Sequence, residues 1–451
     1  MALTTLDRAP GAKVTGNVIC IIIQRMTASI ENLHDTGSLP AVPAAPAAPA
    51  AQRVRGTGLI LLGIVLIAAN LRLSVSATGA LLDQLGSSLR LSSGIESFLT
   101  AVWPLAFAVG GISGSWLARR YTAGTVISAA LGALALGQVV HSLHDTPALV
   151  LGSVLAGIGI ALANVLLPVV VRQYFPDRVG QVTGMYAMVL SGGAAVAALA
   201  SVPVSDGFHN ADAGLAVWVI PAVIGLAAWF AARPQRAAHP TNVPATAEPQ
   251  QHVPLRQLAH SPLAWAMAAL FGLQSVGAYV IMGWLPSVLG SAGMSQSTAG
   301  AVLSTVFFIN IPISYAVPHF GARMRDQRPM LIALSAASVV GFAGLIIAPG
   351  SLAWLWAVFF AFGMAVFPLV LALFPARGGT AHGTAALSTF SQSIGYLLAA
   401  TVPLTFGVLH QATGSWTVPL LIVIVATVLQ AVVGMYVASS RRGTVTRLEH
   451  S

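Results

Sequence analysis

Charged residues are scarce in this chain of 451 residues: Asp, Glu, Lys and Arg make up 7% of it, whereas hydrophobic residues make up 56%. Because soluble domains carry about 25% charged residues, a soluble protein is excluded. Cys20 is the one cysteine, and it precedes the first long hydrophobic run. Disulfides within the chain, thiolate metal clusters and a cysteine nucleophile inside a membrane are therefore excluded as well.

Sequence motifs for catalysis are also lacking. No phosphate-binding loop, Gly-rich dinucleotide fingerprint, HExxH motif or Ser/His/Asp arrangement occurs at a plausible depth, which argues against an ATP-driven pump or an intramembrane enzyme. We expect no cofactor and no bound metal. None of the 12 Asp and Glu residues falls in the middle of a hydrophobic run, so no carboxylate there can carry a proton. This favours a uniporter, or co-transport in which the solute itself is protonated.

Long hydrophobic runs dominate the rest of the chain. From Thr57 onward, 12 runs are long enough to cross a hydrocarbon core, which takes about 20 residues. The predicted spans are 57–82, 95–118, 124–142, 147–171, 179–203, 214–232, 262–287, 296–319, 329–348, 351–374, 382–408 and 415–438. The sequence thus predicts an all-α polytopic membrane protein.

The positive charges follow a topological pattern. Apart from Arg72 and Arg90, Lys and Arg fall in the tails or in alternate gaps between the runs. Cationic loops stay on the cytoplasmic side during insertion, so we expect both termini in the cytoplasm and a place in the bacterial inner membrane. Arg residues occur in pairs and triplets without a continuous basic stripe, so topology explains the net charge of +9 better than a nucleic-acid partner does.

The domain organisation follows from the same pattern. The Pro-Ala-rich segment 1–56 is expected to be a disordered cytoplasmic tail, and the proline-rich segment 233–261 a cytoplasmic linker. These segments separate two six-helix bundles at 57–232 and 262–438, followed by a cytoplasmic tail at 439–451.

The two bundles are repeats of each other. Leu-Pro at 167–168 followed by Phe-Pro-Asp-Arg at 175–178 recurs as Phe-Pro at 367–368 followed by Phe-Pro-Ala-Arg at 374–377. Because each half has six spans, the repeats have the same orientation, and a parallel pair of this kind places a transport site between the halves near the midplane.

Three sequence motifs are typical of one particular transporter family. They are Ala-Asn-Leu-Arg at 69–72, Phe-Pro-Asp-Arg-Val-Gly-Gln-Val-Thr-Gly-Met-Tyr at 175–186, and Leu-Ser-Thr-Phe-Ser-Gln-Ser-Ile-Gly-Tyr at 387–396. With them the chain resembles the cyanate/2-nitroimidazole permease family of the major facilitator superfamily, over about 57–438. The resemblance implies the major facilitator fold, two pseudo-symmetric halves and secondary transport by alternating access. Leu73 stands where the family has proline, and the loop at 114–120 lacks the aspartate of the general superfamily signature.

Arg72 is the one cation inside a span. It lies 15 residues after Thr57, which at about 1.5 Å per residue is roughly 22 Å along the helix and near mid-membrane. Because a guanidinium there costs at least ~2.5 kcal/mol, it must face protein or water. Ser76, Gly79 and Asp83 follow on its face, and Asn70 points elsewhere. Two interpretations stay open: an electropositive site for a small anion or polar ring, or an Arg that ties its helix to neighbouring carbonyls.

Other polar residues at mid-depth are candidates for substrate binding. Ser388, Gln392 and Tyr396 recur at four-residue spacing and share one helix face, which serves either helix packing or solute contact. Taken singly, the remaining candidates are more often interhelical contacts. These are Asn164, Tyr186, Gln274, Tyr279 and Asn310. Trp103 and Trp284 are expected to be anchors at the outer interface.

A second set of charged residues is predicted to form a cytoplasmic gate with state-dependent salt bridges, as in Asp177 with Arg178, or Asp326 with Arg323 and Arg325. The full set is Arg119, Arg120, Asp177, Arg178, Arg323, Arg325, Asp326 and Arg377. The alternative is that these charges serve topology alone.

The sequence therefore predicts a secondary transporter of a small polar solute, either a cyanate-like anion or a nitroimidazole-like heterocycle. Arg72 is the central positive group of a midplane cavity. Export of small toxic aromatic compounds is an alternative, and a non-transporting solute receptor is another. The expected partners are the solute, with or without a co-transported proton, and the lipid bilayer. We expect no nucleic acid and a monomer.

Overall fold

The twelve predicted spans are confirmed. The computed structural model describes residues 57–175, 178–232, 258–321, 323–439 and 445. Within them, 12 helical segments are long and apolar enough to cross a membrane. The predicted tail at 1–56, linker residues 233–257 and most of the last tail lie outside the described residues.

The first half contains six spans, of which the sixth is broken into two helices. They are α2 (Thr57–Leu89), α3 (Ser93–Arg120), α4 (Ala123–His141), α5 (Thr146–Tyr174), α6 (Val179–Phe208), and α7 (Ala211–Ala216) with α8 (Val219–Ala232). Ser92, Thr122 and Asp145 begin α3, α4 and α5 as N-caps whose side chains accept backbone N–H bonds. Such caps satisfy donors that a helix start leaves free.

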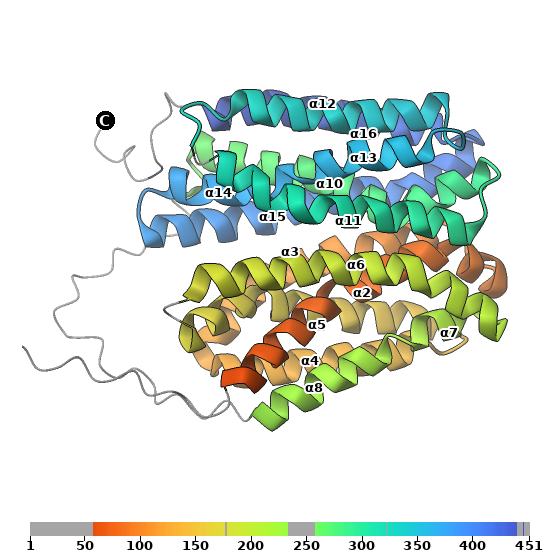
Figure 1. Cartoon of the computed structure of the whole chain (residues 1–451), viewed down its shortest axis with the longest axis horizontal. Coiled ribbons are helices and arrows are strands. Elements are labelled where there is room, and N and C mark those ends of the chain that lie inside the picture. The colour runs from red at the N-terminus through yellow and green to blue at the C-terminus, as the bar shows by residue number, and fades with distance from the viewer. Residues whose placement is uncertain (1–56, 176–177, 233–257, 322, 440–444, 446–451) are drawn as a thin grey trace, which may run out of the picture. The chain divides into compact units, whose positions relative to one another are not determined.

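The second half repeats this plan, with its fourth span broken at Ala365. Its helices are α10 (Pro262–Ser291), α11 (Gln296–Gly321), α12 (Arg328–Ile347), α13 (Ala353–Met364) with α14 (Val366–Gly378), α15 (Ala381–Thr413) and α16 (Thr417–Ala438). Figure 1 shows α2 to α8 in one group and α10 to α16 in the other, with the helices running in a common direction.

Small residues let neighbouring helices pack closely. A Cβ on Gly137 of α4 would meet the backbone of Ala156 on α5, and a Cβ on Gly152 of α5 would meet the backbone of His141 on α4. Close backbone approach at small residues is the usual way for helices to associate without a hydrophobic driving force.

Three helix pairs make most of the contacts between the halves: α2 with α10, α3 with α15, and α6 with α11, and α3 also contacts α10. The second and fifth spans of one half thus contact the fifth and second spans of the other, as a two-fold repeat requires. We call the end where α2 and α10 begin the proximal end, and the end where they finish the distal end.

Several helices run further at the distal end than the hydrophobic runs predicted. Asp83 lies inside α2 and His410 inside α15, beyond the predicted ends of these spans at 82 and 408. Glu96 lies in the first turn of α3, and His141 is the buried last residue of α4. Polar side chains extend these helices because they find partners in neighbouring helices, as Asp83 does with Ser287 of α10.

Candidate functional site

The distal ends of the two halves are joined by hydrogen bonds between α2 or α3 and α10 or α15. Trp284 Nε1 donates to Thr100 Oγ1 at 3.0 Å, and the backbone N–H of Gly407 donates to Ser97 Oγ at 3.1 Å. Ser93 Oγ donates to Gln411 Oε1 at 2.5 Å. With the Ser287 to Asp83 bond, also 2.5 Å, these contacts form what we call the distal seam.

Glycines bring the helix backbones together along this seam. A Cβ on Gly79 of α2 would collide with the carbonyl oxygen of Met282 on α10, and a Cβ on Gly283 would lie 2.8 Å from Cγ2 of Thr100. No larger residue fits at these two positions while the seam is closed. Gly79 and Asp83 contact α10, so the predicted Arg72 face of α2 is the face that meets the other half.

Arg72 reaches across from α2 to α10. Its Nη1 lies 3.4 Å from Sδ of Met282, and its guanidinium carbon lies 5.9 Å from the ring centroid of Tyr279. No carboxylate of the described residues forms an ion pair with it. Asn70 points away, as predicted: its Nδ2 donates to the carbonyls of Leu66 and Pro221. Arg72 therefore faces two soft, neutral groups of the opposite half.

An aromatic cluster adjoins Arg72. The ring of Tyr396 on α15 stacks on Phe107 of α3 at 5.1 Å and meets Phe271 of α10 edge-on at 4.9 Å. Tyr279 lies 6.3 Å from Tyr396. The charge of Arg72 interacts with both tyrosine side chains. The cluster thus offers flat aromatic faces beside a cation, at the contact between the halves.

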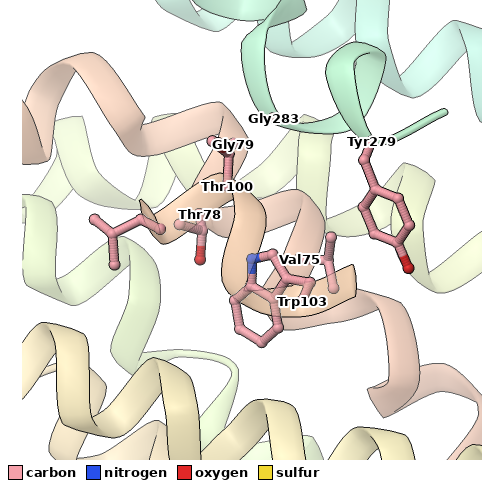
Figure 2. A pocket seen from close by; sticks show the side chains of 8 residues that line it. Val75, Thr78, Gly79, Thr100, Trp103, Tyr279 and Gly283 are labelled. Carbon is pink, nitrogen blue, oxygen red and sulfur yellow. The ribbon is translucent and has the colours of Figure 1, made fainter. Parts of the chain in front are cut away.

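A narrow pocket opens off this region toward the distal seam (Figure 2). Its empty volume is about 190 Å³, and no water-sized sphere fits inside it. The lining residues come from α2, α3 and α10. They are Val75, Thr78, Gly79, Leu99, Thr100, Trp103, Tyr279 and Gly283. Because the Gly79, Gly283 and Thr100 contacts also close the seam, separation of the two halves would widen this pocket.

Two of the predicted substrate-binding residues are engaged in bonds of a structural kind. Asn310 of α11 donates to the carbonyl oxygen of Ala361 on α13 at 2.9 Å and accepts from Ser314. Gln274 of α10 donates to the carbonyl of Phe271 and to Ser275, both on its own helix. Asn310 thus holds two helices of the second half together.

The other candidates differ in their surroundings. Gln392 Nε2 donates to Ser388 Oγ at 2.7 Å, so the four-residue spacing does place these side chains on one face of α15 with Tyr396. Asn164 of α5 and Tyr186 of α6 are half-buried. The structure brings Arg72, Tyr279 and Tyr396 together, and it leaves Asn310 in a separate contact.

The predicted gate residues do not form one cluster in the described residues. Asp326 pairs with Arg328 at 3.8 Å, and Arg323, Arg325, Arg178 and Arg120 are exposed. Buried Arg377 donates from Nη2 to the carbonyl of Ser439 at 2.7 Å, which fastens α14 to the end of α16. Asp177 and the side chain of Arg119 lie outside the described residues.

Sequence reasoning misread two tryptophans. The interpretation of Trp103 and Trp284 as interface anchors is wrong, because they are 1% and 2% exposed and lie inside the bundle. Trp284 belongs to the distal seam, and Trp103 lines the pocket. No sequence signal separates a buried tryptophan near a helix end from an interface anchor, since both lie in hydrophobic runs.

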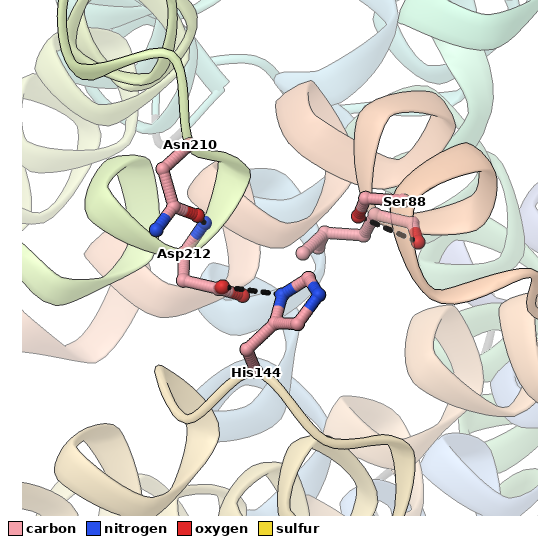
Figure 3. A network of polar contacts seen from close by, with 5 residues as sticks. Ser88, His144, Asn210 and Asp212 are labelled. Atoms are coloured by element: carbon pink, nitrogen blue, oxygen red, sulfur yellow. Dashed lines mark hydrogen bonds and ion pairs between the residues drawn. The ribbon is translucent and has the colours of Figure 1, made fainter.

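A further polar contact at the distal end is structural. His144 Nδ1, between α4 and α5, lies 2.6 Å from Asp212 Oδ2 on α7, and Asn210 caps the same short helix (Figure 3). This contact fixes the α4–α5 turn against α7, away from Arg72.

The Major Facilitator Superfamily model matches residues 60–401. The chain belongs to this superfamily. The 2-nitroimidazole transporter of Escherichia coli (strain K12) is 33% identical over 379 residues, which are 83% of this chain and 94% of the relative. The cyanate transport protein CynX of the same strain is 29% identical over 361 residues, or 79% of this chain and 91% of the relative.

Solved structures agree on the fold. The inward-open xylose transporter XylE from E. coli superposes with a TM-score of 0.68 at 16% identity, covering 87% of this chain and 99% of that one. The nucleoside transporter NupG gives a TM-score of 0.67 at 12% identity over 84% of this chain and 100% of that one. The predicted fold and the resemblance to cyanate and 2-nitroimidazole permeases are thus confirmed. This major facilitator protein is an integral membrane transporter.

Proposed function

We propose that the chain transports a small polar solute, either a cyanate-like anion or a nitroimidazole-like heterocycle, by alternating access. The solute binds beside Arg72, between Tyr279 of one half and the α2 face of the other. Ser388, Gln392 and Tyr396 of α15 complete the site from the second half. Asn164 and Tyr186 remain predicted members of the same site.

The surroundings of Arg72 carry this proposal. Among the described residues, Arg72 contacts the Met282 thioether and the side chain of Tyr279, which leaves N–H donors of its guanidinium for a solute. Arg377, by contrast, donates from Nη2 to a backbone oxygen, the carbonyl of Ser439. A small anion or the oxygens of a nitro group would supply the acceptors that Arg72 lacks.

The aromatic cluster supports the heterocycle in particular. Flat rings stack offset or edge-on with centroids about 4.5–7 Å apart, and Tyr396 meets both Phe107 and Phe271 in that range. The names of the two relatives, a 2-nitroimidazole transporter and a cyanate transport protein, point to the same two solute classes.

We further propose that the proximal end faces the cytoplasm and the distal seam faces the outside, because positive charges favour the cytoplasmic side. Entry of a bare monovalent anion against an inside-negative potential costs about 2.3 kcal/mol per 100 mV. Downhill metabolism or a proton carried with the solute offsets this cost, and a neutral heterocycle avoids it.

Export of small toxic aromatic compounds is a second candidate, and the aromatic cluster is the observation that favours it. Solute flux in proteoliposomes of known orientation separates the two directions. Tight binding without flux in either direction would instead support a solute receptor.

The deciding experiment is a thermal-shift comparison of purified wild type and Arg72→Gln against cyanate, other small monovalent anions and neutral nitroimidazoles. A ligand that binds the native state raises its apparent stability. Stabilisation of the wild type alone by anions or nitroimidazoles supports Arg72 as the solute group. Equal stabilisation of both proteins means that Arg72 is structural, and the proposed site is then wrong.

A further inference from the structure

Trp103 carries a buried hydrogen-bond donor with no acceptor. Its side chain on α3 is 1% exposed, and among the described residues its indole Nε1 has no hydrogen-bond partner. Buried indole N–H groups usually find a partner, since leaving one unpaired is unfavourable. Two other buried tryptophans follow this rule: the indole N–H of Trp284 donates to the Thr100 hydroxyl, and that of Trp218 donates to the Ser201 hydroxyl.

The indole nitrogen of Trp103 lies on the side of Thr78 of α2, as Figure 2 shows. Thr78 and Trp103 both line the pocket.

The pocket is a continuation of the Arg72 site. Val75 and Gly79, which line it, stand three and seven residues after Arg72 on α2, about 4.5 to 10 Å along the helix. Tyr279 lines the pocket and also faces Arg72. A solute held at Arg72 that extends toward the distal seam would meet the indole edge of Trp103.

We propose that the indole N–H of Trp103 is a second, uncharged hydrogen-bond donor of the solute site, which recognises an oxygen acceptor on the solute, such as a nitro oxygen. This inference rests on the proposed function. With the seam closed, Trp103 Nε1 lacks an acceptor among the described residues, and Arg72 contacts the Met282 thioether and the Tyr279 side chain. A solute with acceptors at both ends satisfies both groups once separation of the halves has widened the pocket.

A structural water is the competing explanation. His141 of α4 lies edge-on to Trp103 with ring centroids 6.4 Å apart, and its Nε2 is likewise without a partner. A water between the two rings would satisfy both groups. In that case the loss of either residue would affect stability and leave solute affinity unchanged.

The test compares wild type, Trp103→Phe and His141→Phe in the full chain, with 2-nitroimidazole and imidazole as probes and calorimetric Kd values as the readout. Because Trp103→Phe removes one neutral hydrogen bond to the nitro group, we expect it to weaken 2-nitroimidazole binding by about tenfold. We expect the Kd for imidazole to change by less than about twofold. His141→Phe is expected to bind both probes as wild type does. Trp103→His, which keeps a ring N–H, is expected to retain part of the preference for the nitro compound, and it replaces Trp103→Phe if that variant does not fold.

The outcomes are distinct. If wild type binds 2-nitroimidazole and Trp103→Phe binds it equally well, or if both probes weaken together, the role of Trp103 is overturned while the proposed function stands. Equal losses in Trp103→Phe and His141→Phe point to the water and overturn the inference. If wild type binds neither probe nor any small anion, the proposed function fails, and the inference fails with it.

Discussion

The guanidinium carbon of Arg72 lies 5.9 Å from the ring centroid of Tyr279, so a permanent charge of the first half faces the π surface of the second. The contact crosses between helices that are more than 200 residues apart in sequence, as the Arg72 to Met282 bond at a separation of 210 shows. Because the partners belong to different halves, relative motion of the halves would break the contact. On the proposed function, solute binding at Arg72 is therefore linked to that motion.

Arg72→Gln is expected to abolish stabilisation by small anions while the protein remains inserted and folded. The matched control is Arg377→Gln, which removes a buried Arg whose Nη2 donates to the Ser439 carbonyl. Loss of that charged hydrogen bond should lower the free energy of unfolding by about 1.5–3 kcal/mol and leave the anion-induced thermal shift intact. Thermal unfolding with and without ligand checks both. A ligand shift lost in both variants would mean that the effect is not specific to Arg72.

Gly79→Ala is expected to disfavour the closed distal seam. An alanine inside a helix normally stabilises by about 0.5–1 kcal/mol relative to glycine, but here the methyl group would collide with the carbonyl oxygen of Met282. The control is Gly132→Ala on α4, where an added Cβ meets nothing within 4 Å. We expect faster labelling of a cysteine placed at the seam in Gly79→Ala and no change in Gly132→Ala. Equal labelling rates in the two variants would show that Gly79 does not limit closure.

A disulfide or short cross-link across the seam is expected to stop transport. Ser93 and Gln411 are bonded at 2.5 Å through their side chains, and replacement of Cys20, the one native cysteine, gives a clean background. The protein Cys20→Ser, Ser93→Cys, Gln411→Cys should lose solute flux on cross-linking and regain it on reduction. Labelling of either single cysteine by a membrane-impermeant reagent in intact cells tests whether the distal end faces outside. Undiminished flux after complete cross-linking would contradict alternating access through this seam.

The Asn310→Ala variant tests whether Asn310 joins two helices or binds the solute. Its bond to the Ala361 carbonyl joins α11 to α13, and membrane hydrogen bonds of this kind contribute about 0.6–1.7 kcal/mol. We expect lower thermal stability with unchanged solute affinity. Tyr396→Ala is the comparison, because loss of its stack on Phe107 should weaken heterocycle binding. Equal losses of solute affinity in the two variants would mean that Asn310 belongs to the solute-binding site.

Local sequence patterns predicted much of the candidate site. Arg72 stood out because a charge inside a hydrophobic run is costly, and the structure gives it no counterion among the described residues. The four-residue spacing of Ser388, Gln392 and Tyr396 placed them on one face, since helix geometry alone fixes that relation. Asn70 was correctly directed away from Arg72 for the same reason.

The amino-acid pattern alone predicts the spans, their number and the repeat, because the bilayer requires long apolar helices and each helix sets its own side-chain directions. Which residues of the two halves meet follows from the folded arrangement of the helices. The close approach of Gly79 to Met282, the bond from Trp284 to Thr100 and the free indole N–H of Trp103 all depend on it. The physical reason is that apolar runs are alike in hydrocarbon, so side-chain packing between distant segments, rather than hydrophobicity, selects these contacts.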